Sequence, residues 1–493
     1  MNIKEPTLRH FHEDEVEASS FFKHDGHVVA QKVIFEIIDR VDGKGKLTRE
    51  SIQDGIVTSK LFIIILSFVM GLYEIVTLPS FMYQKEVLGM SPQTMQVIAG
   101  IIGLPWCIKP VFGYIIDTLV LKVKKTKYIV ICTASLKIFL FASVFAFEPG
   151  VFFFYLITFL VLLCSLFENI IAEYTLVISS KKANELNPDQ TENHLPIYFG
   201  FKAAGCLIAN FWGGRIMQMY SIGTAFLLAS FLPIIVLAAA FGYHEKSTQT
   251  PKTKTNWSDQ FIAIKKLILR EKVFQLVVFI CLINMTPNFD ALYTFYLKDY
   301  LKFTPEDIAN CSATATICYI IGLLLYYYKL KNVNPKIFYV GTNFLLWFVN
   351  VSFLLVVLHY IEQWGMSNKV FCLLNWGIYS LVSELNFMPI LAIWCSLCPK
   401  NLEATSITLF TGLLNLSNNL SNYFGAFLIW MLDYREGNYD RMYHLLLIQN
   451  AYLLLAIIGI SFVEFPDPRD DRKEIDMSAK SEAKKEVSQI IVD

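Results

Sequence analysis

Residues 102–117 read Ile102-Gly103-Leu104-Pro105-Trp106-Cys107-Ile108-Lys109-Pro110-Val111-Phe112-Gly113-Tyr114-Ile115-Ile116-Asp117, inside an apolar run long enough to cross a bilayer. The run nevertheless holds a lysine, an aspartate and two prolines. A charge near the middle of a membrane helix costs about 2.5–3.5 kcal/mol, so such charges are kept mainly where they face a cavity or a partner. Each proline removes a backbone hydrogen bond and bends the helix, which neighbouring helices compensate. The stretch therefore predicts a kinked membrane helix that lines a polar path.

The composition of the whole chain is typical of a membrane protein with several spans. Of its 493 residues, 55% are hydrophobic and 17% are charged, whereas soluble domains carry about 25% charged residues. The formal net charge is zero, which argues against a nucleic-acid partner. The ten cysteines lie mostly in apolar runs, and no Cys/His group has the spacing of a zinc site. We therefore interpret them as small core residues and expect neither a metal nor a cofactor.

Apolar runs of the length that crosses a bilayer, about 20 residues, occur about twelve times and predict an all-α protein. Their predicted limits are 59–84, 92–120, 128–147, 151–179, 197–219, 222–243, 272–297, 305–328, 335–359, 369–396, 403–431 and 442–463. The longest internal polar segment divides these spans into two halves of six. The predicted organisation is a tail at 1–58, a bundle at 59–243, a linker at 244–271, a bundle at 272–463 and a tail at 464–493.

The basic residues between the spans predict the orientation in the membrane. If the N-terminus is cytosolic, the inner loops and span ends hold seventeen Lys and Arg residues and the outer ones hold six. Because basic residues favour the cytoplasmic side, both termini are expected in the cytosol. No cleavable signal sequence is expected in the polar residues 1–58. The plasma membrane is the default expectation, and an organellar membrane stays open.

A short repeat relates the two halves. Residues 83–92 read Tyr-Gln-Lys-Glu-Val-Leu-Gly-Met-Ser-Pro, and residues 296–305 read Tyr-Leu-Lys-Asp-Tyr-Leu-Lys-Phe-Thr-Pro. Each copy joins the first span of its half to the second. Ser91 and Thr304 have the character of N-cap residues that precede a proline at the first helical position. Two halves repeated in the same orientation are typical of the major facilitator fold.

With the repeat and the kinked helix in hand, the chain resembles the folate–biopterin transporter family, a branch of the major facilitator superfamily, over roughly residues 60–430. The segments that carry the resemblance are Leu88–Pro92, Gly103–Pro110 with Gly113 and Asp117, Phe201–Gly205, Met388-Pro389, Cys398–Thr405, Asn415 and Gly425. The Pro-Trp-x-x-Lys-Pro and Cys-Pro…Glu-Ala-Thr blocks are the more specific ones. The resemblance implies a transporter for a small organic anion (folate, a pterin or a p-aminobenzoate-like compound). Symport with protons is expected on physical grounds, because buried carboxylates near basic residues can have pKa values moved toward the working pH.

Span four departs from the family pattern, which tends to have two aspartates four residues apart followed by a glutamate. In this chain, Glu168 or Asn169 stands at the first acidic position and Glu173 at the second, whereas the third is apolar. At about 100° per residue, Asn169 and Glu173 share one helix face, while Glu168 and Glu173 diverge by about 140°. We therefore expect Glu173 to face the cavity, and the alternative for Glu168 is an ion pair with a neighbouring helix.

Acidic residues within the spans form a pattern that does not depend on the resemblance. Away from the span ends they fall only in spans one, four, seven and ten, the helices that surround the cavity of a facilitator fold: Glu74, Glu168, Glu173, Asp290 and Glu384. The candidate anion-binding residues are Lys109 and Lys202, either of which could instead pair with an acid, and Lys202 could also extend to the lipid headgroups. Aromatic neighbours that could stack on a flat ligand are Trp106, Tyr174, Phe289 and Trp394.

Two further charges are candidates for gating. Asp117 ends span two just before a basic loop, where the facilitator loop motif pairs such an acid with basic residues to hold the halves together. Arg215 lies near the predicted outer end of span five and either closes an outer gate or extends to the headgroups. Asn415, Asn418 and Asn419 in span eleven either hydrogen-bond between helices, which is the default expectation, or line the cavity.

The leading hypothesis is a secondary active transporter that works by alternating access. No GxxxxGK[ST] nucleotide loop is present, so direct ATP coupling is unsupported. A membrane enzyme is disfavoured because no Ser/His/Asp, HExxH or Cys/His constellation occurs within the spans. A non-transporting sensor is also disfavoured, because such a protein has no need of acidic residues buried within its spans. Transport of another small solute remains open because span four departs from the family.

Overall fold

Helices make up nearly all of the computed structural model, which describes residues 60–115, 126–186, 194–243, 265, 268–330, 332–397, 403–432, 439 and 441–465. All of these residues belong to the unit Ser59–Asp493, one of the two units into which the contacts divide the chain. Asp117, the two predicted tails (except residues 464 and 465) and most of the predicted linker lie outside the described residues.

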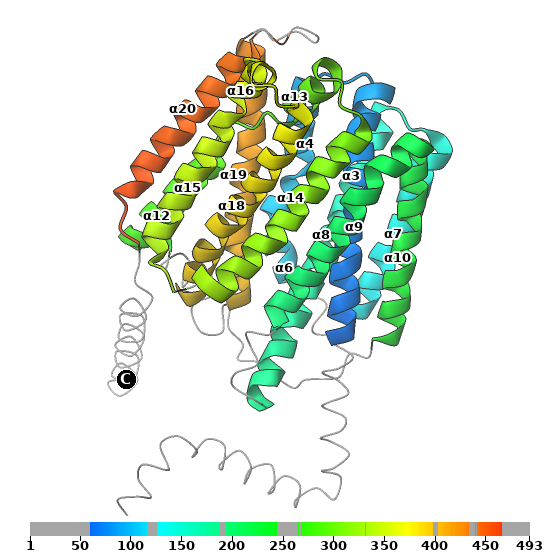
Figure 1. Ribbon diagram of the computed structural model, residues 1–493. Coiled ribbons are helices and arrows are strands. Elements are labelled where there is room, and N and C mark those ends of the chain that lie inside the picture. The colour runs from blue at the N-terminus through cyan, green and yellow to red at the C-terminus, as the bar shows by residue number, and fades with distance from the viewer. Residues whose placement is uncertain are drawn as a thin grey trace, which may run out of the picture. The chain divides into compact units, whose positions relative to one another are not determined.

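The described part of the first half contains six membrane-length segments (Figure 1). The first segment runs from Lys60 to Val87 and includes η1 (Tyr73–Val76), α3 (Thr77–Met82) and the π-helix η2 (Tyr83–Val87). The others are α4 (Pro92–Ile102) with α5 (Leu104–Cys107) and α6 (Lys109–Ile115), then α7 (Thr126–Phe147), α8 (Val151–Leu186), α9 (His194–Met219) and α10 (Ile222–Gly242).

The second half follows the same plan in its described residues. Its segments are α12 (Glu271–Asn284) with α13 (Asp290–Phe295) and the π-helix η5 (Tyr296–Tyr300), α14 (Pro305–Leu325) with η6 (Tyr326–Leu330), α15 (Pro335–Ser352) with α16 (Leu354–Val357) and α17 (Tyr360–Gln363), α18 (Asn368–Leu397), α19 (Glu403–Met431) and α20 (Met442–Ser461). Every predicted span therefore contains helix. Among the described residues, seven helical segments are long and apolar enough to cross a membrane.

The short repeat has the same local structure in both halves. The π-helices η2 and η5 occupy equivalent positions. After each π-helix, a residue adopts a left-handed conformation: φ is 60° at Gly89 and 58° at Lys302. The N-caps then form as predicted, because the Ser91 hydroxyl accepts from the N–H of Thr94 (3.3 Å) and the Thr304 hydroxyl from that of Asp307 (3.2 Å). The end of the molecule that carries the turns 88–91 and 301–304 is called the hairpin end below.

The kinks that the sequence predicts in span two are present. The helix is interrupted at Gly103 and again at Ile108, so that α4, α5 and α6 follow one another as separate pieces. Pro105 lies in the first turn of α5, and Pro110 is the second residue of α6. A proline has no N–H to donate to the preceding turn, so both breaks occur where the backbone hydrogen bonds are lost.

Span seven was predicted as one helix over 272–297, and that prediction is wrong. Helix α12 ends at Asn284, and α13 begins at Asp290. Pro287 lies in the break, and side chains from other helices replace the missing backbone partners: Ser421 Oγ donates to the Thr286 carbonyl, Gln96 Nε2 to the Asn288 carbonyl, and Gln449 Nε2 to the Pro287 carbonyl at 2.8 Å. A broken helix is tolerated in a membrane protein where such partners satisfy its backbone.

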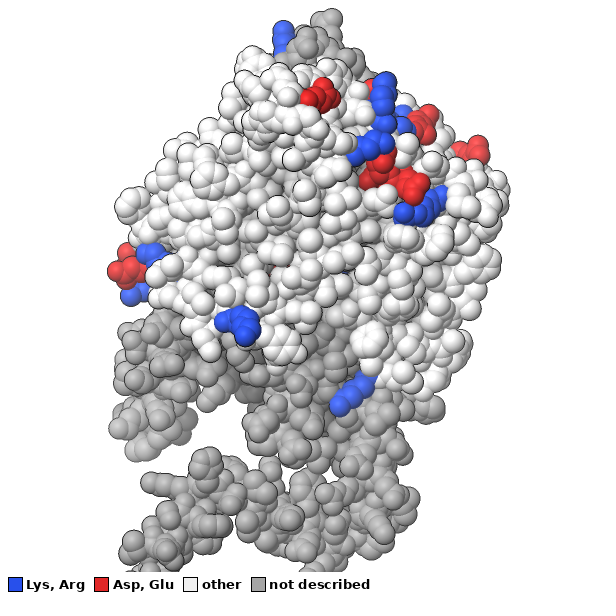
Figure 2. Space-filling view, in the orientation of Figure 1, with Lys and Arg blue, Asp and Glu red and all other residues white. Residues whose placement is uncertain are grey.

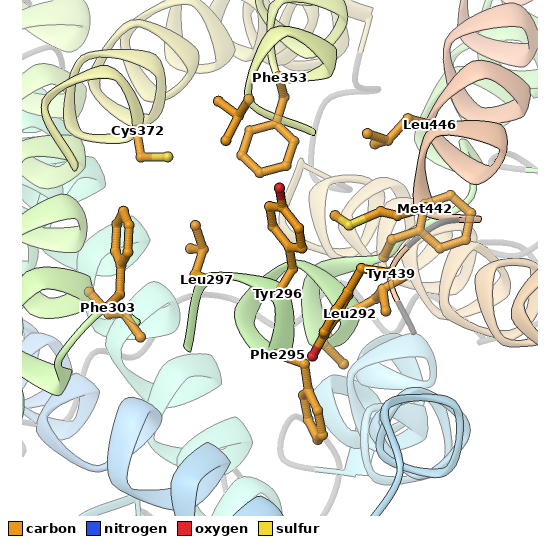
Figure 3. Packing of buried hydrophobic residues seen from close by; sticks show 14 of the residues in the cluster. Leu292, Phe295, Tyr296, Leu297, Phe303, Phe353, Cys372, Tyr439, Met442 and Leu446 are labelled. Atoms are coloured by element: carbon orange, nitrogen blue, oxygen red, sulfur yellow. The ribbon is translucent and has the colours of Figure 1, made fainter. Parts of the chain in front are cut away.

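The two halves meet along two pairs of spans. The kinked span α4–α6 packs against α19, and α9 packs against α14. Gly214 of α9 permits the second contact, because a Cβ there would collide with the Pro305 backbone at the start of α14. One apolar cluster belongs to the first half alone, whereas the largest one lies mainly in the second half and includes Met82, Met95 and Met217 of the first. Figure 3 shows part of the largest one, in which Tyr296 points from its helix toward Phe353 beside Leu297 and Met442.

Candidate functional site

Charged side chains are unevenly distributed over the visible surface. Figure 2 shows most of them near the upper end, with a wide uncharged band below and a few charges near the lower end. An uncharged band of this kind is what a lipid environment requires, because exposed charges are costly there. Against this background, the charges buried in the described part of the bundle stand out: Lys109, Lys137, Glu168 and Glu384.

Lys109, the first residue of α6, is the centre of a polar network in the first half. Its Nζ donates to Glu173 Oε1 at 2.7 Å and to Asn169 Oδ1 at 2.8 Å. Asn169 Nδ2 in turn donates to the Tyr198 hydroxyl of α9 at 3.0 Å. The break at Ile108 turns the lysine toward α8, where Asn169 and Glu173 share the predicted face. Lys109 is 4% exposed and Glu173 is 32% exposed, so the network reaches solvent through its carboxylate.

Glu168 faces the other way and pairs with a residue that the sequence analysis did not single out. Its Oε2 lies 2.7 Å from Lys137 Nζ of α7, and both side chains are fully buried. The Lys137 ammonium also lies 4.0 Å from the ring centroid of Tyr73. The alternative given for Glu168, an ion pair with a neighbouring helix, is thus the arrangement observed. Lys137 could have been noticed as the single lysine in the middle of span 128–147.

Glu74 of the first segment and Lys202 of α9 lie near one another. The two helices approach closely because a Cβ on Gly71 would collide with the Lys202 carbonyl. Glu74 is exposed and accepts a hydrogen bond from Thr77 Oγ1 at 2.7 Å, and Cys206 lies within electrostatic range of both charges. Lys202 is half-buried and has no hydrogen bond or ion pair to any residue in the described part of the chain. It is therefore the less constrained of the two candidate lysines.

Asp290 stands at the break in span seven, at the first position of α13. Its side chain is exposed although its neighbours Phe289 and Ala291 are buried. Asn288 holds it from both sides: Asn288 Nδ2 donates to Asp290 Oδ2 at 3.0 Å, and the Asp290 N–H donates to Asn288 Oδ1 at 2.7 Å. The helix that carries it, α13, also packs against α4 of the other half.

Glu384 is the second acid that the sequence placed in the C-terminal half. It is buried on α18, where Gly322 allows α14 to approach closely. Its Oε1 has no hydrogen-bond partner among the described residues. Tyr319 of α14 lies close enough to interact electrostatically with Glu384 and also with Tyr198. Tyr319 and Tyr198, which the sequence analysis missed, thus lie between the acid of one half and the network of the other.

The remaining predicted residues fall outside this group. Arg215 lies at the hairpin end, where it pairs with Glu306 (3.0 Å) and Asn310 (2.9 Å) of the opposite half. Asp117 is not among the described residues, and the side chain of Tyr174 is not described either.

The aromatic candidates for ligand stacking fall into two groups, one beside the Lys109 network and one in the apolar packing. The Trp106 ring lies 5.9 Å from Lys109 Nζ, whereas Phe289 is fully buried and Trp394 stacks on Phe410. Phe289 and Trp394 are therefore packing residues. Of the span-eleven amides, Asn415 donates to the Trp106 carbonyl (3.3 Å) and Asn419 to Cys107 Sγ (3.0 Å), so these two hydrogen-bond between helices as expected.

Two repeated helical halves that meet along paired spans, with charges buried between helices, define a transporter of the major facilitator fold. Solved structures of that fold are similar to this chain: the nucleoside transporter NupG (TM-score 0.60, 14% identity, 82% of this chain and 98% of that chain) and a D-xylose–proton symporter (TM-score 0.60, 11% identity, 84% and 99%). Within this class, the chain belongs to the BT1 family, whose model matches residues 70–484.

Relatives of this chain include transporters from distant organisms. A folate-biopterin transporter of Synechocystis sp. is 24% identical over 431 residues, which cover 86% of each chain. Folate transporter 1 of Plasmodium falciparum is 23% identical over 399 residues, which cover 80% of this chain and 76% of that one. The chain is therefore a multi-pass membrane transporter of the folate–biopterin type and not an enzyme.

Proposed function

We propose that this protein transports folate, a pterin or a related small organic anion in symport with protons, by alternating access. The observation that carries the proposal is the Lys109–Glu173 pair, which is buried at the lysine and reaches solvent at the carboxylate. While Glu173 is ionised, it and Asn169 occupy the lysine ammonium. Protonation of Glu173 removes the competing negative charge and frees Lys109 for a carboxylate of the ligand.

This exchange links proton binding to anion binding. A ligand carboxylate that takes the place of an ionised Glu173 leaves two acids competing for one lysine, which disfavours the ionised form of both. The proton and the anion therefore bind together, which is the requirement for symport. Lys202, which makes no ion pair within the described residues, is the second cation available to a ligand with two carboxylates.

The ring of a pterin needs different partners from its carboxylates. Its N–H edge requires acceptors, which Asp290 and Glu384 of the second half supply, and its face requires an aromatic surface such as Trp106. The exposed Asp290 carboxylate is held by Asn288 through one oxygen only, so its other oxygen is available. Glu74, with its exposed carboxylate near Lys202, is assigned to the same proton- and ligand-binding set.

The proposed setting is the plasma membrane, with both termini in the cytosol and the hairpin end outside. This orientation is supported by the seventeen basic residues on the inner side against six on the outer side. An organellar membrane is compatible with the same orientation relative to the cytosol.

The test is uptake of labelled folate and p-aminobenzoate into transport-deficient cells at acidic and neutral pH, with and without a protonophore. Wild-type uptake should be stimulated by acid and reduced by the protonophore. Glu173→Gln, which keeps the side chain permanently neutral, should lose both the acid stimulation and the proton-driven accumulation. Glu464→Gln is the matched control, because Glu464 is 72% exposed and pairs only with the equally peripheral Lys272 among the pairs described here.

A second candidate is transport of another small solute, which the amide Asn169 at the first acidic position of span four favours. If neither folate nor p-aminobenzoate enters cells that display the protein at their surface, the folate assignment is wrong. A counterscreen with sugars, nucleosides and amino acids in the same cells then separates another transported solute from a non-transporting sensor.

A further inference from the structure

Two ion pairs join the halves at the hairpin end, and both involve the repeated segment. Lys85 Nζ of η2 donates to both carboxylate oxygens of Asp299 in η5, at 2.7 and 2.6 Å. In the opposite direction, Lys298 of η5 contacts the Glu86 carboxylate of η2. Each half therefore contributes one lysine and one acid to the other.

The two pairs are equivalent under the symmetry of the repeat. Lys85 corresponds to Lys298, and Glu86 corresponds to Asp299, so one contact is the symmetry mate of the other. The correspondence extends to the next layer: Lys85 Nζ lies 3.9 Å from the ring centroid of Phe295, and Lys298 Nζ lies 3.2 Å from Sδ of Met82, the residue equivalent to Phe295. Such reciprocal contacts are typical of a two-fold interface: when residue i of one half contacts residue j of the other, the equivalents of i and j also contact one another.

The two π-helices place these side chains at the junction. A π-helical turn changes the direction of the side chains that follow, and such turns are frequent at functional sites. Here both occur in the last turn of the first span of each half, directly before the hairpin. Lys85 is 10% exposed and Lys298 is 21% exposed, so both ammonium groups are partly removed from water.

We propose that Lys85, Glu86, Lys298 and Asp299 form the gate at the hairpin end, and that both ion pairs must break for the transport path to open there. The proposal rests on alternating access, as in the proposed function, but not on the identity of the ligand. The halves can separate at this end only if the first spans move apart, and these four residues form the ion pairs that join the first spans in the described part of the chain, beside the aromatic contact of Phe81 with Phe295. Arg215 with Glu306 adds a third contact between the halves nearby.

The two pairs are not equally strong. Asp299 also accepts a hydrogen bond from the Tyr439 hydroxyl at 3.1 Å, and the Phe295 ring lies under Lys85. The Lys298 ammonium has a thioether in place of a ring, and Glu86 is more exposed than Asp299 (43% against 34%). We therefore expect that loss of Lys85 opens the gate more than loss of Lys298.

The chain offers a matched control at the same end. Lys369 Nζ lies 2.6 Å from Asp307 Oδ2, but both residues belong to the second half, on α18 and α14. These helices pack extensively on one another and move together if the halves move as units. Lys369 is more exposed than Lys85 (49% against 10%), but breaking or cross-linking its pair removes the same kind of charge at the same end without touching the ion pairs between the halves.

The experiment uses a reporter cysteine in place of Thr77, an exposed residue of the first span, labelled by a membrane-impermeant maleimide added from the hairpin side. Lys85→Met should speed labelling about tenfold, the scale expected for a half-buried charge pair, and Lys298→Met should speed it less. The exchange Lys85→Asp with Asp299→Lys should restore slow labelling. Lys369→Met should leave the rate unchanged.

A second arm closes the gate covalently. Cysteines in place of Lys85 and Asp299, joined by a reducible bis-methanethiosulfonate, should stop uptake until a reductant is added, whereas the same cross-link between positions 369 and 307 should not. If labelling stays slow in Lys85→Met with Lys298→Met and the cross-linked protein still transports, the gate is wrong. If labelling behaves as expected but no folate-type ligand is transported, the gate stands and the ligand assignment fails.

Discussion

The buried Lys137–Glu168 pair allows a sharp separation of structural from functional charge. The perturbation is the removal of one partner or of both. Lys137→Met leaves the Glu168 carboxylate in the interior without its only partner among the described residues, because Oε1 already has none. Glu168→Met leaves the Lys137 ammonium, but still above the Tyr73 ring at 4.0 Å. The double substitution removes both charges and fills a similar volume with thioethers.

The expected magnitudes follow from the complete burial of both side chains. Removal of one partner from a buried ion pair costs about 3–5 kcal/mol, whereas replacing both by apolar residues is neutral or stabilises by about 1–4 kcal/mol. A desolvated ammonium over an aromatic face retains about 2 kcal/mol. Lys137→Met should therefore be the most damaging variant, Glu168→Met should be milder, and the double variant should be close to wild type.

The assay is the midpoint of thermal unfolding in lipid nanodiscs, combined with uptake by the same variants. If the pair only joins α7 to α8, the double variant keeps both its stability and its proton-driven uptake. A double variant that is as unstable as Lys137→Met would refute the burial argument. A stable double variant that exchanges ligand but no longer accumulates it would place Glu168 in the proton path.

Three smaller predictions concern the backbone and the periphery. Gly425→Ala should destabilise by about 1–3 kcal/mol and reduce uptake, because its Cβ would collide with the Asn288 carbonyl in the break of span seven; thermal unfolding and uptake measure this. Lys302→Gly should stabilise by about 1 kcal/mol in thermal unfolding, since it relieves a left-handed backbone at φ 58°. Lys272 lowers the pKa of Glu464 by a hydrogen bond and by its charge. The ion pair should therefore be fully formed at pH values above the ordinary glutamate pKa and be lost as the pH falls through the lowered pKa of Glu464. Chemical-shift titration of a labelled Glu464 measures this.

The two backbone predictions, Gly425→Ala and Lys302→Gly, have controls in the same chain. Alanine at Gly341, where a Cβ would meet nothing within 4 Å, should not destabilise the protein. Alanine at Gly89, the equivalent of Lys302 with φ 60°, should destabilise it, because a Cβ is disfavoured there. If Lys302→Gly and Gly89→Ala shifted stability in the same direction, the backbone argument would be wrong.

The sequence predicted the fold well because its signals are local. The apolar runs, the prolines of span two and the N-caps at Ser91 and Thr304 are all signals carried by the local sequence. Each predicted run contains helix among the described residues, seven helical segments of that part are long and apolar enough to cross a membrane, and the prolines and N-caps have the predicted effect. The break in span seven was missed although Pro287 signals it locally, and only the partners that satisfy the broken backbone come from elsewhere. Gln96, Ser421 and Gln449 replace the lost backbone partners, and nothing near residue 287 reveals that they do so.

The sequence predicted which types of residue form the candidate site better than it predicted which of them contact one another. The helical angle between Glu168 and Glu173 correctly indicated that they face different ways, since it follows from the geometry of one helix. Which lysine each would meet depended on the packing of three helices, and so Lys137 was overlooked. Tyr198 was overlooked because an aromatic residue in a membrane span has no special signal in a sequence with 24 tyrosines.

The separation of Glu168 and Glu173 gives span four two kinds of charge within six residues. Glu168 is sealed in the bundle with Lys137, whereas Glu173 shares Lys109 with an amide and is 32% exposed. In the proposed symport, the carboxylate that reaches solvent is the one placed to exchange a proton, whereas Glu168 is out of contact with solvent. An amide at position 169 satisfies Lys109 without a second negative charge, so that a single proton on Glu173 is enough to release the lysine. On this argument, Asn169→Asp should keep Lys109 occupied after Glu173 is protonated, and uptake should then require a more acidic medium than in the wild type.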